Sequence, residues 1–381
     1  MQSKQHYDSQ HIDSPLSSDA DAPYMNKNPL NRMSDSTTEN MSYTRRFYDA
    51  FIWRAQALWH FGLTPWPISL GINDKRWENA LKLVNNLYGF EDPRPMGPLV
   101  ELAGPIYSDD MTSLGKLEPD LDQYLAIHQR VVYVAFGQYA KSYTIETSTQ
   151  LLHMLLENYE SGSLDGFIWC ATQGTPLPDY VTTSSGTQYH LNNTEFRNIG
   201  RIMPWTQQKE ILRHPSIVTF VTHGGASSIF EAAYFGKRML FFPFYGDQIS
   251  NAMYFERNAA GLWFILEETD TMTMTAALGR VLKDEKGVMQ QAMKRLQAIV
   301  QIHGQHALAR ATDLVEEVAF TADSDGKLPH RLDIARNLSF LKQNNYDLYL
   351  GLSILVTASV MLSYRLVVLL KEHLRIKMKI E

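Results

Sequence analysis

The sequence predicts an α/β protein built around a doubly wound parallel sheet, and two observations lead to this prediction. Between residues 100 and 320, short apolar runs alternate with helical patterns of ten or more residues. Parallel strands that are joined by helices produce this alternation. In addition, the run from Arg130 to Gly137 is apolar at almost every position, which suits a strand covered by helices on both faces of a sheet.

The elements of this fold are predicted one by one from local patterns. Strands are expected where short apolar runs end at glycine or polar residues, over 100–103, 130–137, 167–171, 217–222, 239–244 and 261–265. Helices are expected where apolar residues recur at helical spacing, over 43–59, 77–87, 120–128, 144–159, 208–212, 226–235, 249–258, 274–283, 286–301 and 307–320. Residues 172–200 are polar and rich in turn formers, which predicts a surface loop.

Composition limits the classes of function. The chain of 381 residues has a net charge of −6, which argues against a nucleic-acid partner. Its single cysteine, Cys170, excludes an intrachain disulfide and is expected to be a small core residue. There is no Cys-x-x-Cys pair, and His303 and His306 lack a carboxylate partner, so no metal site is predicted.

The two ends differ from the centre. Residues 1–42 are rich in Ser, Asp, Asn and Gln and show no secretory signal. We expect them to be disordered, because they cannot bury enough apolar surface to fold. Residues 348–370 are a run of 23 residues with one charge, Arg365, and roughly 20 apolar residues span a bilayer. A transmembrane helix is expected here, the alternative being a buried core helix, and the basic residues of 371–381 place the tail in the cytoplasm.

A glycine-rich turn, His223-Gly224-Gly225, joins the expected strand 217–222 to the expected helix 226–235. Glycines let backbone N–H groups approach an anion, and a helix N-terminus adds partial positive charge. His223 is placed to donate to a diphosphate, and Ser227 and Ser228 can donate to phosphate oxygens. The alternatives are that His223 only holds the turn and that the serines only cap the helix.

The residues around this turn belong to a longer pattern. It consists of Trp205, Gln208, His214-Pro215, His223-Gly224-Gly225, Glu231 and Asp247-Gln248. Its spacing resembles the signature of the UDP-dependent glycosyltransferases, the glucuronosyltransferase-like family. The resemblance covers the chain from Leu83 to the C-terminus and includes residues 85–95, which are similar to the interdomain segment of that family.

The resemblance implies a GT-B fold, in which two Rossmann-like domains face each other and the C-terminal one binds the nucleotide sugar. The resemblance also implies the residues that bind the UDP-sugar. Trp205 would contact the uracil, Gln208 the base or ribose, and Glu231 the ribose hydroxyls. The diphosphate would be bound by His223, Gly225, Ser227 and Ser228, and the sugar hydroxyls by Asp247 and Gln248. The alternatives are a packing role for Trp205 and a solvated helix position for Glu231.

The chain also departs from the family pattern. Gln207 and Arg238 stand where the family has prolines, and Gln138 stands where it has a serine that reaches the phosphates.

The general base is a second departure. In the family it is a histidine oriented by an aspartate in the N-terminal domain, and inverting transfer needs such a base to deprotonate the acceptor. Here His6, His11 and His60 lack the strand-then-glycine context of that base. The catalytic residues therefore stay unassigned.

The resemblance implies an organisation along the chain. A disordered tail over 1–42 precedes a helical remnant of the acceptor domain with the interdomain linker over 43–99. They are followed by one complete Rossmann-like donor domain over 100–325, a membrane-proximal segment over 326–347, the transmembrane helix over 348–370 and a basic tail over 371–381.

The expected function is transfer of a hexosyl or glucuronosyl group from a UDP-sugar, as co-substrate and without a further cofactor, to a hydroxyl of a lipophilic acceptor. The alternative is a catalytically incomplete donor-binding subunit or regulator that needs a partner chain for the acceptor domain and the base. Such a chain would form a homo- or hetero-oligomer with full-length relatives. The last five residues resemble a dilysine signal, so a single-pass protein of the endoplasmic reticulum is expected.

Two topologies stay open. With a signal peptide, the donor domain would be lumenal, and Asn192-Asn193-Thr194 and Asn337-Leu338-Ser339 would be glycosylation sequons. As a tail-anchored protein, the chain would keep the donor domain in the cytosol.

Overall fold

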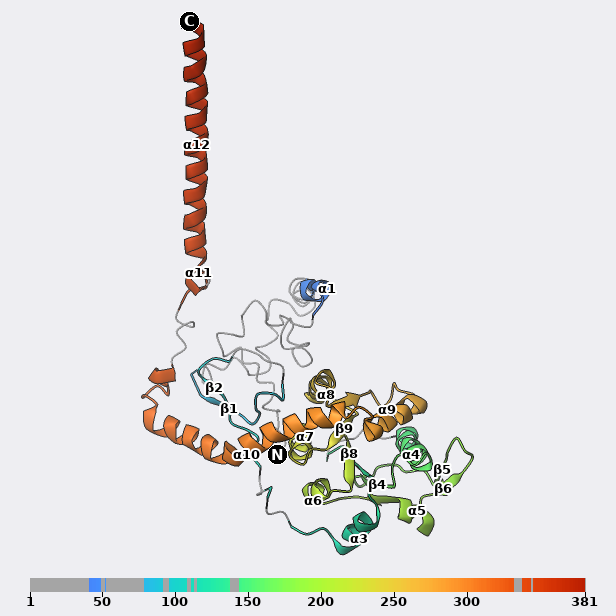
Figure 1. Cartoon of the computed structure of the whole chain (residues 1–381). Helices are drawn as coiled ribbons and strands as arrows, with labels where there is room; N and C mark the ends of the chain where they lie inside the picture. The colour runs from blue at the N-terminus through green and yellow to red at the C-terminus, as the bar shows by residue number, and fades with distance from the viewer. Residues whose placement is uncertain are drawn as a thin grey trace. The chain divides into compact units, whose positions relative to one another are not determined.

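The structure is a computed structural model, and it describes residues 41–48, 52, 79–91, 96–107, 111–112, 115–137, 144–331, 338–343 and 345–380. It divides into two compact units, Met1–Pro329 and His330–Glu381, whose elements are labelled in Figure 1. The expected disordered tail and most of the expected helix over 43–59 lie outside the described residues, except for a short helix α1 (Tyr43–Phe47).

A six-stranded sheet organises the first unit. Its strands are β3 (Val131–Ala135), β4 (Gly166–Cys170), β7 (Gly200–Met203), β8 (Ile217–Thr222), β9 (Arg238–Phe241) and β10 (Gly261–Trp263). They run in the order β10-β9-β8-β3-β4-β7, and every pair is parallel. The order reverses between β3 and β8, as in doubly wound nucleotide-binding folds. The predicted α/β class with a parallel sheet is thus confirmed.

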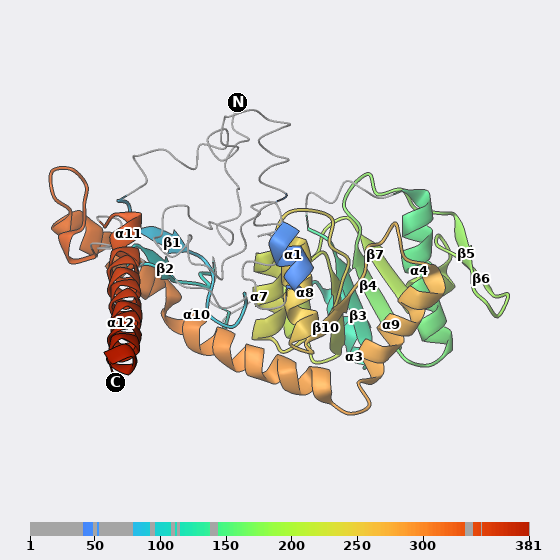
Figure 2. The same cartoon turned by 90° about the horizontal axis from the view of Figure 1, so that it is seen from above.

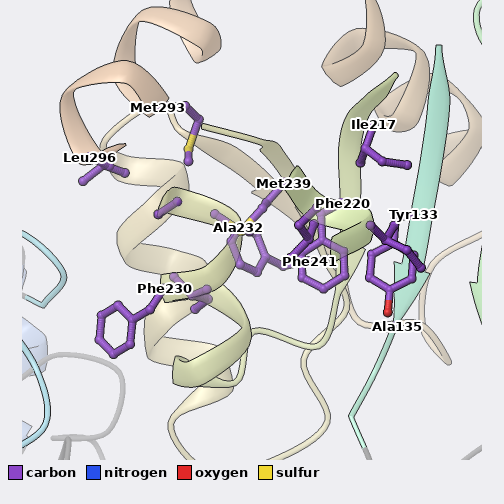
Figure 3. Close-up of a cluster of buried hydrophobic side chains, with 14 of the residues drawn as sticks. Tyr133, Ala135, Ile217, Phe220, Phe230, Ala232, Met239, Phe241, Met293 and Leu296 are labelled. Atoms are coloured by element: carbon purple, nitrogen blue, oxygen red, sulfur yellow. The ribbon is translucent and has the colours of Figure 1, made fainter. Parts of the chain in front are cut away.

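Helices cover both faces of the sheet, as the continuous apolar strands require. One core contains side chains of α3 (Pro119–Ile127), α6 (Gln208–Arg213), α7 (Ala226–Tyr234), α8 (Gln248–Arg257) and α10 (Val288–Thr321). The opposite core contains side chains of α4 (Ile145–Glu160), α5 (Thr194–Ile199) and α9 (Thr271–Lys283). Figure 2 shows α4 and α9 on one side of the strands and α7, α8 and α10 on the other, and Figure 3 shows part of the first core.

The predicted helix over 77–87 is wrong. Residues 82–84 form β1 (Lys82–Val84), which pairs in parallel with β2 (Val100–Leu102). This two-stranded sheet is separate from the six-stranded one. Lys82 and Val84 are buried while Leu83 between them is only half-buried, the alternation of a strand. Pairing with a segment that lies later in the chain overrides the local helical pattern.

The two helices expected over 286–301 and 307–320 are one helix, α10, of 34 residues. Gly304, which lies between the two predicted ranges, is part of this helix. A Cβ atom at Gly304 would lie 3.1 Å from Cε2 of Tyr107. The glycine therefore allows close packing of α10 against Tyr107 instead of ending the helix.

The predicted surface loop over 172–200 contains more structure than expected. A hairpin of β5 (Tyr180–Thr182) and β6 (Gln188–His190) lies within it, followed by α5. Two carboxylates of α4 hold this hairpin. Glu160 accepts from Thr183 Oγ1 at 2.7 Å and from the hydroxyl of Tyr189 at 3.0 Å, and Glu157 accepts from Ser184 Oγ at 2.6 Å.

The second unit begins within a 3₁₀ turn, Pro329–Arg331. It contains α11 (Phe340–Gln343) and α12 (Tyr346–Ile380). Residues Tyr346–Lys371 are long and apolar enough to cross a membrane, and none of this stretch is buried.

Lys237 is a buried cation at the end of α7. It is only 8% exposed, and its Nζ donates to the carbonyl oxygens of His214 and Ile217, each at 2.9 Å. Burial lowers the pKa of Lys237 from 10.5 to about 8. The two carbonyl groups lie where α6 ends and β8 begins, so this side chain joins both elements.

This pKa shift predicts how stability depends on pH. An unfolded lysine keeps its usual pKa, so between pH 8 and 10.5 the unfolded state binds more protons than the folded state, and the free energy of unfolding rises with pH. Relative to Lys237→Met, wild type should gain about 2 kcal/mol from pH 7.5 to 10. Urea unfolding in detergent measures the free energy of unfolding of both proteins at each pH. The titrating groups that the two proteins share cancel when one free energy is subtracted from the other. A difference that does not change with pH contradicts the prediction.

Candidate functional site

The candidate site lies where the strand order reverses. Gly137 follows β3, and His223-Gly224-Gly225 follows the adjacent strand β8. The carboxyl ends of parallel strands at such a point are the usual ligand site of this architecture. Gly137 and Gly224 have φ angles of +73° and +91°, which glycine adopts without the steric cost of a side chain.

The imidazole of His223 lies between two of these glycines. A Cβ atom would lie 3.0 Å from His223 Nε2 if placed on Gly137, and 2.5 Å from it if placed on Gly225. Side chains at either position would therefore displace the ring. This close approach explains why both turns carry glycine, and the sequence pattern alone identified only Gly225.

The hydroxyl of Thr222 is the hydrogen-bond neighbour of the His223 ring. The backbone N–H of Gly224 donates to Thr222 Oγ1 at 3.4 Å, and that hydroxyl is 3.5 Å from His223 Nδ1. When Thr222 donates to Nδ1, the proton of the neutral ring is on Nε2, the atom that faces the glycines. Burial lowers the pKa of His223 to about 4. At neutral pH the residue is therefore an uncharged N–H donor.

Helix α7 starts at this turn. Gly225 is its N-cap and has no side chain to accept from the first N–H groups, so these groups face the end of the strand as anion-binding donors. Ser227 is exposed and Ser228 is half-buried. Ser228 Oγ accepts from Gln208 Nε2 at 3.1 Å, which joins the helix start to α6.

Gln208 and Glu231 form the second part of the site. Gln208 Nε2 donates to Glu231 Oε2 at 2.7 Å, and Gln208 Oε1 accepts from the hydroxyl of Tyr133 at 3.3 Å. Both residues are half-buried. Glu231 is thus held by a neighbouring amide, and the alternative of a solvated helix position does not describe it.

Trp205 follows β7 at the same edge of the sheet and is 63% exposed. It does not pack in the core, although its neighbour Thr206 is buried. A flat aromatic surface that faces solvent is suited to stacking against a base.

Asp247 and Gln248 are 6% and 4% exposed. Asn251 Nδ2 donates to Asp247 Oδ2 at 2.8 Å and to the carbonyl oxygen of Gly224 at 2.9 Å. Gln248 Oε1 accepts from the backbone N–H of Phe244 at 2.9 Å. Asn251 therefore ties Asp247 to the glycine turn, and Gln248 is held against the backbone that follows β9.

The departures from the family pattern have structural roles where they are described. Gln207 Oε1 accepts from the backbone N–H of Glu118 at 3.1 Å, and Arg238 donates to the carbonyl oxygen of Leu282 at 3.2 Å. Gln138 lies outside the described residues, as do His6, His11 and His60.

Four residues of the site were missed by the sequence patterns: Gly137, Tyr133, Thr206 and Asn251. Two of them had a usable signal. Tyr133 is the only polar-tipped residue within an otherwise apolar strand, and Asn251 lies four residues after Asp247 on one helix face. Within the described ranges no three His, Cys, Asp or Glu residues group as metal ligands.

Comparison with known proteins gives a family match over residues 72–367, to the family described as "UDP-glucoronosyl and UDP-glucosyl transferase". The chain is 30% identical to UDP-glycosyltransferase 1 of Phaeomoniella chlamydospora, over 79% of this chain and 60% of that protein. It is 31% identical to a UDP-glycosyltransferase of Talaromyces amestolkiae, over 72% of this chain and 54% of that protein. The chain thus spans between half and two thirds of the length of these relatives.

A solved structure, that of UDP-glucose: anthocyanidin 3-O-glucosyltransferase in complex with UDP, is similar over 61% of this chain, with 21% sequence identity and a TM-score of 0.48. Similarity at this level places no residue of the site.

Proposed function

The chain belongs to the UDP-glucuronosyl and UDP-glucosyl transferase family, and on this premise we propose that it binds a UDP-sugar at the carboxyl ends of β3, β7 and β8. One observation carries the proposal: the Nε2 atom of His223 lies between Gly137 and Gly225 at the start of α7. Such an arrangement provides backbone and imidazole N–H donors for a diphosphate without a side chain in the way.

The other residues would hold the rest of the donor. Trp205 would stack on the uracil, and Glu231, fixed by Gln208, would accept from the ribose hydroxyls. Ser227 and Ser228 would donate to phosphate oxygens, and Asp247 and Gln248 would hold the sugar hydroxyls. No cofactor other than the UDP-sugar co-substrate is part of this proposal.

The reaction would transfer a hexosyl or glucuronosyl group to a hydroxyl of a lipophilic acceptor. The bond between the anomeric carbon and the diphosphate oxygen breaks, a bond to the acceptor oxygen forms, and the acceptor proton goes to a general base. His223 and the start of α7 would stabilise the leaving diphosphate. The acceptor class is supported by the apolar helix α12, because a chain held at a bilayer meets hydroxyl compounds that partition into lipid. Within a GT-B fold, residues 100–325 would be the donor domain.

The proposal is tested with the full chain in detergent. Calorimetric titration with UDP is expected to show binding at one site, with GDP binding at least tenfold more weakly if the proposed site selects uracil. Incubation with UDP-glucose or UDP-glucuronic acid and a panel of lipophilic phenols then tests transfer by mass spectrometry. Absence of UDP binding overturns the donor site, and binding of UDP without transfer to any acceptor overturns the activity.

We also propose that α12 spans the membrane of the endoplasmic reticulum with the donor domain on the lumenal side. The basic residues that follow the apolar stretch favour a cytoplasmic C-terminus, and this places the preceding domain on the opposite side. Asn192 of the sequon Asn192-Asn193-Thr194 lies in an exposed turn after β6, where a glycan can be attached.

Glycosylation of Asn192 tests this topology. Sequons are also present at Asn40 and Asn337, so the experiment uses an Asn40→Gln/Asn337→Gln background expressed in a eukaryotic cell. In this background the protein should lose mass on treatment with an N-glycosidase, and the additional Asn192→Gln change should remove that loss. A glycosidase-insensitive protein in the Asn192-containing background contradicts the lumenal assignment.

A further inference from the structure

Tyr133 is a buried polar residue at the centre of the sheet. It is the third residue of β3, whose other residues are valine and alanine, and it is 1% exposed. A phenol hydroxyl at such a position loses its contacts with water, so it requires hydrogen-bond partners within the protein. Its ring stacks on Phe220 of β8 with centroids 5.2 Å apart and an interplanar angle of 11°. Figure 3 labels both residues in the buried cluster.

The partners of the hydroxyl belong to the candidate donor site. Tyr133 Oη lies 2.7 Å from Thr206 Oγ1 and donates to Gln208 Oε1 at 3.3 Å. Both partners lie on the segment that follows Trp205. Burial raises the pKa of Tyr133 above its usual value, so the phenol keeps its proton at neutral pH.

The bonds around Gln208 form a directed chain. Thr206 can donate to Tyr133, and Tyr133 donates to the carbonyl oxygen of the Gln208 amide. The two N–H bonds of that amide are then directed to Ser228 Oγ at 3.1 Å and to Glu231 Oε2 at 2.7 Å. A flipped amide would place its oxygen against the carboxylate of Glu231, so the buried phenol and the carboxylate select the same orientation.

We propose that Tyr133 is a positioning residue of the donor site, whose hydroxyl fixes Gln208 and, through it, the carboxylate of Glu231 that receives the ribose hydroxyls. This inference rests on the proposed function and adds a residue that touches no ligand. It also connects the rigid centre of the sheet to the segment that carries Trp205, since Thr206 shares the same hydroxyl.

The test is Tyr133→Phe, which keeps the ring on Phe220 and removes only the hydroxyl. UDP and 2′-deoxy-UDP are titrated into the full chain in detergent. We expect UDP to bind about tenfold more weakly, the usual effect of one lost hydrogen bond in a partly buried network. The preference for UDP over 2′-deoxy-UDP should fall as well, because the phenol no longer fixes the amide that donates to Glu231. A general loss of packing would instead weaken the binding of UDP and of 2′-deoxy-UDP by the same factor.

A double-mutant cycle shows whether Tyr133 acts through Gln208. The loss in Tyr133→Phe/Gln208→Ala should equal that of Gln208→Ala alone, because both changes remove the same contact. Tyr189→Phe is the matched control: it deletes a phenol that donates to Glu160 at 3.0 Å on the hairpin, and UDP affinity should not change. If Tyr133→Phe does not fold, Thr206→Val, which is nearly isosteric, should lower the same preference.

The outcomes separate this inference from the proposed function. A wild-type chain that does not bind UDP overturns the proposed function. The role of Tyr133 alone is overturned by either of two results in a wild-type chain that binds UDP. In the first, Tyr133→Phe keeps its affinity and its ribose preference. In the second, the loss in Tyr133→Phe adds to that in Gln208→Ala.

Discussion

Replacing His223 with alanine is expected to weaken UDP binding by about 10- to 100-fold, the equivalent of one hydrogen bond to a charged group. The ring is an uncharged donor in the free protein, because burial lowers its pKa to about 4, and its Nε2 faces the space between two glycines. Removal of the ring takes away this donor and leaves the backbone N–H groups of α7. Calorimetric titration of both proteins with UDP measures the loss.

The substitution Gly225→Ala provides an independent test of the same geometry. Gly225 has a φ of −67°, which alanine adopts without strain, so the only obstacle is the 2.5 Å approach of a Cβ atom to His223 Nε2. Gly225→Ala should therefore weaken UDP binding to a similar extent as His223→Ala, and the double variant should be no weaker than His223→Ala. Gly115→Ala is the control, because its Cβ atom would meet only Glu210 Oε1, at 3.6 Å.

One result would separate these two variants. If Gly225→Ala kept wild-type affinity while His223→Ala lost it, the ring would be free to bind the diphosphate from another position. The close packing of the imidazole between Gly137 and Gly225 would then not be the feature that places it.

The buried strands were the elements best predicted from sequence. A strand of a parallel sheet that is covered on both faces is a continuous apolar run, so its limits are visible locally, and the predicted strand 217–222 coincides with β8. Elements that depend on a distant partner were predicted less well. β1 pairs with β2, which lies later in the chain, and the helix α10 includes Gly304, where the absence of a Cβ atom leaves room for Tyr107.

The candidate site shows the same division. The turn with His223 and Gly225 could be predicted because its residues are consecutive and its glycines are conspicuous. Gly137 could not, since its importance comes from the approach of His223 Nε2 from the neighbouring strand. Tyr133 and Thr206 were missed for a similar reason: 73 positions separate them in the chain, and only the fold brings their hydroxyl groups to 2.7 Å.

Replacing Trp205 with alanine should lower the affinity for UDP and leave the stability of the protein almost unchanged. The side chain is 63% exposed, so its loss removes little buried apolar area, and the melting temperature should stay within about one degree of wild type. Stacking of an aromatic ring on a base contributes about 1–3 kcal/mol, so UDP should bind about 10- to 100-fold more weakly. Trp205→Phe should restore most of the affinity, because phenylalanine also offers a ring face to the base.

Ligands that contain only part of the nucleotide distinguish base stacking by Trp205 from an indirect effect of its replacement. Stacking acts on the base, so Trp205→Ala should weaken UDP and uridine by the same factor, whereas His223→Ala should weaken UDP and leave uridine unchanged. Inorganic diphosphate, measured as a competitor of UDP, should bind more weakly to His223→Ala and should bind to Trp205→Ala as it does to wild type. A Trp205→Ala protein that melts several degrees lower and binds UDP and uridine as wild type does would assign this exposed tryptophan to packing instead of base recognition.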